Sequence, residues 1–283
     1  MKTVTAEPFV DGLVFGEGPR WHDGHLYVSD MFAHQLLRID MQGNKIVLAE
    51  VPGRPSGSGF LTDGSQLLVS MVDRRILKLN AGGVTELADL NPLTDADLND
   101  MVVNANGDAY IGSFGFDLFG GAEPAMGNIV LLPRDGSPPR VVADDLNFPN
   151  GMVITPDGKR LISAETFGHQ LIQYDIGADG SLLNRREFAS LGDYTPDGIC
   201  LDAEGAVWIA SFVTDEFVRV KEGGEITHRV DPGRPAVACA LGGPERKTLF
   251  MISAETDIER LAKGDSKAFI ETIKVDVPGA GIP

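Results

Sequence analysis

The sequence has few cysteines, few basic residues and no long apolar run. Its 283 residues include only Cys200 and Cys239, which have no Cys-x-x-Cys spacing, so we expect buried thiols in a reducing compartment. The sequence has 24 Lys and Arg residues and 41 Asp and Glu residues, and the resulting formal charge of −17 argues against a nucleic-acid partner, which needs a basic surface. No run of about 18 apolar residues occurs, and Glu7 interrupts the N-terminal segment. We therefore expect no membrane span, no secretion signal and a cytoplasmic location.

A short β-rich segment that ends in serine occurs six times along the chain. The serines are Ser29, Ser70, Ser113, Ser163, Ser211 and Ser253, and a Gly-containing turn signal such as Asp23-Gly24 precedes each run. Asx-Gly between apolar runs is the strongest short-range hairpin signal. About four strands per repeat of ~40–50 residues predict an all-β, six-bladed β-propeller with four-stranded antiparallel blades.

We expect this propeller to form one domain over residues 1–283, with the segment Lys2–Val10 completing the sixth blade. The alternative is a β-sandwich with coincidental spacing, which six turns and six serines at the same phase argue against.

Oxygen-bearing side chains recur at one phase of the repeat, just before an apolar strand. Asn99, Asn150 and Asp197 stand there, and Glu17 stands at nearly the same distance before its turn. The second repeat has Ser56 at this phase, and the sixth places Cys239 nearby. Four of the six blades are therefore expected to point an oxygen donor at the propeller axis. Two carboxylates and two carboxamides suit Ca²⁺, or less readily Mg²⁺ or Mn²⁺. The alternative is ordinary Asn-Gly and Asp-Gly turn chemistry.

The same residues carry a family resemblance over essentially the whole chain. Glu17-Gly-Pro-Arg-Trp21, Pro149-Asn-Gly-Met152 and Pro196-Asp-Gly-Ile199 resemble motifs of the gluconolactonase, senescence-marker-protein and luciferin-regenerating family. The resemblance implies a six-bladed propeller with one axial divalent cation, Ca²⁺ foremost and Zn²⁺, Mn²⁺ or Mg²⁺ as alternatives, and lactone hydrolysis. It also implies Glu17, Asn150 and Asp197 as metal ligands, with Asn99 close to both metal and substrate.

Two features depart from that pattern or add to it. Asp97 stands where sugar-lactone members carry a substrate-contacting Arg, so it either redirects specificity or is an innocuous loop acid. Phe114, Phe116 and Phe119 lie in the longest insertion, where they would form a lid over the substrate or fill a gap between blades. If these three side chains line the pocket, the substrate is more hydrophobic than a sugar-acid lactone.

The expected reaction is hydrolysis of a small-molecule lactone or related ester, in which metal-activated water attacks a metal-polarised carbonyl group. Asp197 is the favoured catalytic base and Asp100 the alternative. The five histidines lie outside the axial phase, and no Gly-x-Ser-x-Gly motif occurs. The remaining alternatives are other chemistry on a small carbonyl compound, or a non-catalytic metal- or ligand-binding scaffold. We expect no nucleic-acid or membrane partner, and a monomer or weak homo-oligomer.

Overall fold

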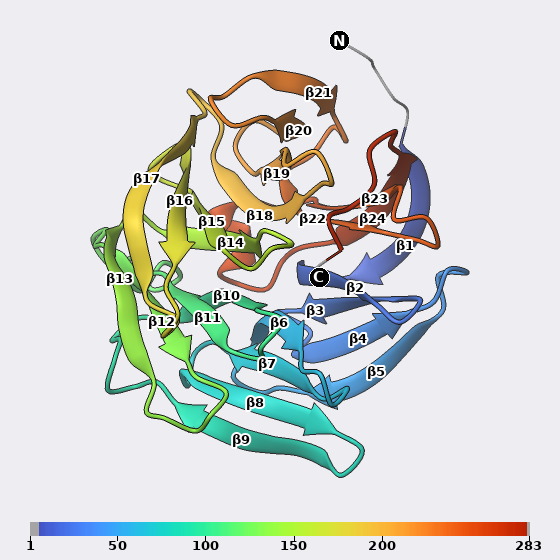
Figure 1. Cartoon of the computed structure of the whole chain (residues 1–283). Coiled ribbons are helices and arrows are strands. Elements are labelled where there is room, and N and C mark those ends of the chain that lie inside the picture. The colour runs from blue at the N-terminus through green and yellow to red at the C-terminus, as the bar shows by residue number, and fades with distance from the viewer. Residues whose placement is uncertain (1–5, 282–283) are drawn as a thin grey trace.

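The computed structural model describes residues 6–281, and these form six four-stranded antiparallel sheets arranged in a ring (Figure 1). The expected all-β, six-bladed propeller is confirmed. The described residues contain one helix, α1 (Ile258–Leu261), which is one turn long. This part of the chain therefore has no helix that is long and apolar enough to cross a membrane.

Each blade uses four strands in order from the axis outward. Blade 1 has β2 (Gly16–His22), β3 (His25–Asp30), β4 (Gln35–Ile39) and β5 (Lys45–Glu50). Blade 2 has β6 (Pro55–Phe60), β7 (Gln66–Ser70), β8 (Arg75–Asn80) and β9 (Gly83–Asp89). Blade 3 has β10 (Leu98–Val103), β11 (Ala109–Ser113), β12 (Gly127–Leu132) and β13 (Arg140–Leu146). Blade 4 has β14 (Pro149–Ile154), β15 (Arg160–Glu165), β16 (Gln170–Ile176) and β17 (Leu182–Ser190). Blade 5 has β18 (Pro196–Leu201), β19 (Val207–Ser211), β20 (Glu216–Val220) and β21 (Ile226–Val230).

Blade 6 joins the two ends of the chain. It consists of β22 (Ala236–Gly242), β23 (Thr248–Ala254), β24 (Ala268–Lys274) and, as its outermost strand, β1 (Glu7–Leu13). The Asp30 carboxylate accepts hydrogen bonds from the backbone N–H groups of Val14 and Phe15, which fixes the path from β1 into blade 1. The predicted closure by the N-terminal segment is therefore confirmed for β1, whereas residues 2–5 lie outside the described residues.

The predicted turns and serines occupy equivalent places in the blades. The turn between β2 and β3 has positive φ at Asp23 (45°) and Gly24 (77°), the backbone conformation of a tight hairpin. All six repeat serines lie on the second strand of their blade and are buried. The serine repeat is therefore a packing feature of the fold.

The innermost strands pack closely against their neighbours at the point where each begins. A Cβ atom on Gly57 would lie 2.1 Å from the backbone nitrogen of Met101, so only glycine permits this approach of β6 to β10. Each innermost strand also shifts its register against the second strand near its start, for example between Pro149 and Met152. Such bulges redirect side chains, and here they lie beside the residues that face the axis.

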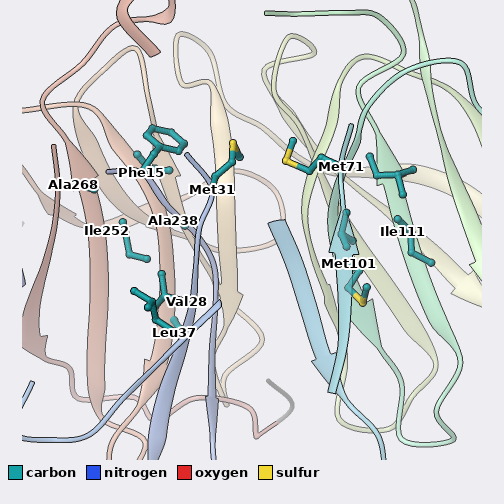
Figure 2. Close-up of a cluster of buried hydrophobic side chains, with 14 of the residues drawn as sticks. Phe15, Val28, Met31, Leu37, Met71, Met101, Ile111, Ala238, Ile252 and Ala268 are labelled. Atoms are coloured by element: carbon teal, nitrogen blue, oxygen red, sulfur yellow. The ribbon is translucent and has the colours of Figure 1, made fainter. Parts of the chain in front are cut away.

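The largest hydrophobic cluster combines side chains from blades 1, 2, 3 and 6 (Figure 2). Figure 2 shows Phe15 and Met31 together at one end of the cluster, with Val28 and Ile252 deeper between the strands. Phe15 and Met31 also line the pocket described below, so one wall of that pocket continues the packed core.

Candidate metal centre and substrate pocket

Four oxygen-bearing side chains from four blades meet at the floor of one pocket. Glu17, Asn99, Asn150 and Asp197 all line it, and they are 8%, 3%, 6% and 9% exposed, respectively. Each lies at or next to the first residue of an innermost strand, as the repeat phase predicts. Their assignment as metal ligands or substrate contacts stays a prediction, but their convergence is a property of the fold.

The sixth blade differs from the sequence expectation. The pairing of Ala236 with Ser253 places Val237, which is fully buried, at the position equivalent to Asp197. Cys239 lies two residues further along β22, with its Sγ atom 3.6 Å from Sγ of Cys200. The turn of the sixth repeat is loosely defined in the sequence, so counting back from it gave Cys239 instead of Val237, two residues too far along the chain.

Hydrogen bonds hold the nitrogen atoms of both carboxamides, that of Asn99 to the neighbouring blade 4 and that of Asn150 within blade 4 itself. Nδ2 of Asn99 donates to the carbonyl oxygen of Pro149 (3.1 Å), and Nδ2 of Asn150 donates to Oγ1 of Thr166 (3.2 Å). The Thr166 hydroxyl in turn donates to the carbonyl oxygen of Pro196 (2.7 Å). Because the nitrogen ends are held in this way, the Oδ1 atoms are the ends that remain for a cation.

Burial disfavours the charged forms of the carboxyl groups at the pocket floor. It raises the pKa of Glu17 well above its usual range, and the neighbouring acids Asp197 and Asp100 raise it further. Burial likewise raises the pKa of Asp197 to about 8, although a hydrogen bond from Asn150 acts to lower that pKa. A nearby cation would relieve this cost by favouring the ionised forms.

An arginine spans three blades beneath this floor. Nη2 of Arg20 donates to Oδ1 of Asp100 (2.7 Å) and to the carbonyl oxygen of Met101 (2.6 Å), while its Nε donates to the carbonyl oxygen of Ser58 (3.0 Å). Both members of the Arg20–Asp100 ion pair are buried. Burial raises the pKa of Asp100, and the Arg20 charge opposes that rise.

The donor set fits one divalent cation. When ionised, Glu17, Asp100 and Asp197 carry three negative charges against the one positive charge of Arg20, which leaves a net charge of −2. Residues 6–281 contain no cluster of three or more His, Cys, Asp or Glu side chains placed to hold a metal, so a cation here would need the carboxamide oxygens as well as the carboxylates. Two carboxylates with carboxamide oxygens form a hard-oxygen set of the kind that Ca²⁺ prefers.

Above this floor the pocket has an empty volume of about 740 Å³, part of which is its open mouth. Phe114 and Phe119 of the predicted aromatic loop line it, together with Asn99. Phe116 does not line it, but its ring contacts those of Phe148 and Phe167, which do.

The aromatic loop fills space between blades as well as lining the pocket. The Phe114 ring stacks on Phe148 of blade 4 with centroids 4.5 Å apart, and the Phe119 ring meets Phe32 of blade 1 edge-on at 5.6 Å. The gap-filling alternative is therefore confirmed, whereas a lid over the substrate stays a prediction.

Asp97 lies outside the residues that line this pocket. Its pKa is raised by burial and by Asp117, while Arg54 and Arg74 oppose that rise. Its backbone carbonyl accepts a hydrogen bond from the N–H group of Phe114. A role of Asp97 in substrate specificity stays a prediction. Such a role would be indirect, because Asp97 contacts the aromatic loop and does not line the pocket.

Comparison with known proteins identifies the family. A model described as the SMP-30/Gluconolactonase/LRE-like region matches residues 15–255. The chain belongs to this family. The resemblance carried by the sequence motifs is thereby confirmed.

Two curated relatives of this SMP-30/gluconolactonase-family chain are named as lactonases. This chain is 26% identical over 294 residues to 6-deoxy-6-sulfogluconolactonase of Pseudomonas putida, and the match covers 100% of this chain and 97% of that protein. It is 28% identical over 257 residues to L-arabinolactonase of Azospirillum brasilense, covering 88% and 84%. A solved structure of a calcium-binding protein, regucalcin from Agrobacterium tumefaciens, superposes with a TM-score of 0.77 at 22% identity, covering 98% and 97%.

Several pocket residues of this family member were missed by the sequence analysis. Phe148 directly precedes Pro149-Asn150, and Phe212 directly follows the repeat serine Ser211; both line the pocket. Each lies next to a residue whose place in the repeat is clear from the sequence, and that place could have predicted that it lines the pocket. Ile258 and Leu261 come from α1, whose place over the pocket had no repeat signal to indicate it.

Proposed function

We propose that this SMP-30/gluconolactonase-family protein hydrolyses the ester bond of a small-molecule lactone. A divalent cation, Ca²⁺ foremost, would be held by Glu17, Asn150 and Asp197 and would supply Lewis acidity toward the carbonyl oxygen. The observation that carries the proposal is the convergence of buried, mutually repelling carboxylates and oriented carboxamides at the floor of a small-molecule pocket. The lactonase names of two relatives and the calcium-binding solved neighbour support it.

The chain's own residues would divide the work as follows. Asp197 accepts a proton from the attacking water, because its carboxylate reaches the pocket from an axial position. Asn99 lines the same pocket, and its Nδ2 donates a hydrogen bond to the Pro149 carbonyl oxygen of the neighbouring blade, which leaves its oxygen for the cation or for a hydrogen-bond donor on the substrate. Asp100 is engaged by Arg20 beneath the floor and is not among the lining residues, so it is the weaker candidate base.

The test measures acid release from a lactone panel together with Ca²⁺ binding by calorimetry. We expect chelation to stop acid release and added Ca²⁺ to restore it. Asp197→Asn and Glu17→Gln should each abolish measurable Ca²⁺ binding, and Asp197→Asn should lower kcat by at least about 10²-fold.

The matched control is Glu50→Gln, which removes a carboxylate from an exposed position on β5 and should leave both readouts unchanged. Full turnover after exhaustive chelation, with metal content verified near zero, would contradict the role of the cation. Absence of acid release from every lactone by the Ca²⁺-loaded protein would contradict lactone hydrolysis.

A further inference from the structure

The wall of the pocket is almost entirely hydrocarbon above its polar floor. Eleven of its seventeen lining residues are apolar and come from blades 1, 3, 4, 5 and 6. They are Phe15, Met31, Phe114, Leu118, Phe119, Phe148, Phe167, Phe212, Val213, Ile258 and Leu261. A substrate that enters this space therefore exchanges water for aromatic and aliphatic carbon.

The six polar lining residues offer little to a substrate's hydroxyl groups. Four of them form the candidate cation site at the floor, and the other two are Thr166 and Thr195. The Thr166 hydroxyl donates to the Pro196 carbonyl oxygen, and Oγ1 of Thr195 accepts from the backbone N–H of Val213. Both threonines are thus already hydrogen-bonded within the protein.

None of the described lining residues is Lys, Arg or His. A sugar lactone would bury several hydroxyl groups against this wall, and each one without a partner lowers affinity by about 10-fold or more. A charged substituent on the sugar would likewise meet no cationic side chain on the wall.

Exposed apolar side chains continue the wall outward to the rim. Phe167 is 40% exposed, Val213 70% and Ile258 44%, and each lies on a connection in a different blade. Apolar groups gathered around one opening mark a ligand-contacting surface, whereas single scattered ones do not.

We propose that the substrate is an apolar lactone, whose ester carbonyl lies at the polar floor and whose alkyl or aryl substituent lies against the phenylalanine-rich wall. This inference rests on the proposed lactone hydrolysis and specifies its substrate class. It separates this chain from the two relatives whose names specify 6-deoxy-6-sulfogluconolactone and L-arabinolactone substrates.

The first experiment compares δ-lactones that bear methyl, propyl or pentyl substituents with glucono-δ-lactone, using the Ca²⁺-loaded protein and subtracting uncatalysed hydrolysis. Each added CH₂ group should raise kcat/KM by about 3–4-fold until the wall is covered. The pentyl lactone should exceed glucono-δ-lactone by at least about 10²-fold. Values of kcat/KM that stay flat along the series would overturn the inference.

The second experiment makes the rim more polar; Val213→Thr keeps the side-chain shape, whereas Ile258→Thr also removes one methyl carbon. The paired substitutions Val213→Thr and Ile258→Thr should lower kcat/KM for the pentyl lactone by about 10-fold and affect the methyl lactone less. Val84→Thr with Ile46→Thr is the matched control, because these two side chains are of the same types and also exposed but lie on outer strands β9 and β5. Equal losses in both pairs, or no loss in the rim pair, would contradict the inference.

The outcomes also distinguish failure of this inference from failure of the proposed lactone hydrolysis. Faster hydrolysis of glucono-δ-lactone than of the pentyl lactone overturns the apolar class and leaves lactone hydrolysis standing. If no lactone is hydrolysed, the proposed function fails, and calorimetry with a non-hydrolysable pentyl δ-lactam against the unsubstituted lactam decides the wall's preference. Tighter binding of the pentyl lactam supports an apolar ligand, and equal binding overturns it.

Discussion

Arg20 shows at the scale of one residue how the pocket floor is held together. Its guanidinium group links carbonyl oxygens of blades 1, 2 and 3 and pairs with Asp100. A buried charge that loses its partner costs far more than the pair contributes net, because the remaining charge stays desolvated.

We expect Arg20→Leu to lower the free energy of unfolding by about 3–5 kcal/mol. The double variant Arg20→Leu with Asp100→Asn should recover part of this loss, because no buried charge is left unpaired. Urea denaturation of the four members of this cycle provides the measurement. A double variant no more stable than Arg20→Leu alone would show that the guanidinium's carbonyl contacts, rather than the ion pair, dominate.

Cation binding should depend on pH because the metal-free carboxyl groups hold their protons unusually well. The pKa of Asp197 is raised to about 8 from an ordinary 3.8, and that of Glu17 is also raised. A cation binds the ionised forms, so Ca²⁺ affinity should increase as pH rises toward about 8, with release of protons. Calorimetry in buffers of different ionisation enthalpy counts those protons, and constant affinity from pH 6 to 8 would contradict the raised pKa.

The raised pKa of Asp197 has the opposite effect on the stability of the cation-free protein, which should fall as pH rises. Between pH 3.8 and about 8 the folded, cation-free protein holds more protons at Asp197 than the unfolded chain. This site should therefore destabilise the metal-free protein progressively as pH rises through that window. Saturating Ca²⁺ should abolish this contribution, as should Asp197→Asn.

At the scale of the strand, the contact between blades near the axis tolerates no side chain at certain positions. Gly57→Ala would place Cβ against the backbone of β10, so we expect a loss of at least about 2 kcal/mol in the free energy of unfolding. Gly112→Ala is the matched control, since its Cβ would meet its nearest neighbour at an ordinary 3.4 Å. Equal unfolding midpoints for the two variants would show that β6 and β10 separate easily.

Strands and turns were predictable because each local signal repeats. The turn at Asp23-Gly24 and the serine on each second strand recur in every blade, and the repeat phase placed Asn99, Asn150 and Asp197 together. Contacts that occur in one blade only had no such signal. Arg20 meets Asp100 across 80 residues of sequence, and only closure of the ring brings them together.

At the scale of the whole molecule, the formal charge of −17 places the folded protein under self-repulsion. Salt screens charges beyond about 10 Å at 0.1 M, so added NaCl should raise the thermal midpoint of the cation-free protein by a few degrees. A scan from 0.02 to 0.5 M NaCl measures this, with an uncharged osmolyte at equal osmolality as the control. A midpoint that falls, or that rises equally with the osmolyte, would contradict the electrostatic cause.

The pairing of β1 with β24 also sets the order of events during synthesis. Thr272, the partner of Glu7, is added to the chain more than 250 residues after it. At bacterial or eukaryotic elongation rates of ~5–20 residues per second, this strand waits on the order of 10–50 s for its partner. β1 is thus made before the other strands of the propeller and is among the last to be paired, and during that interval its unpaired edge can associate with other chains unless chaperones cover it.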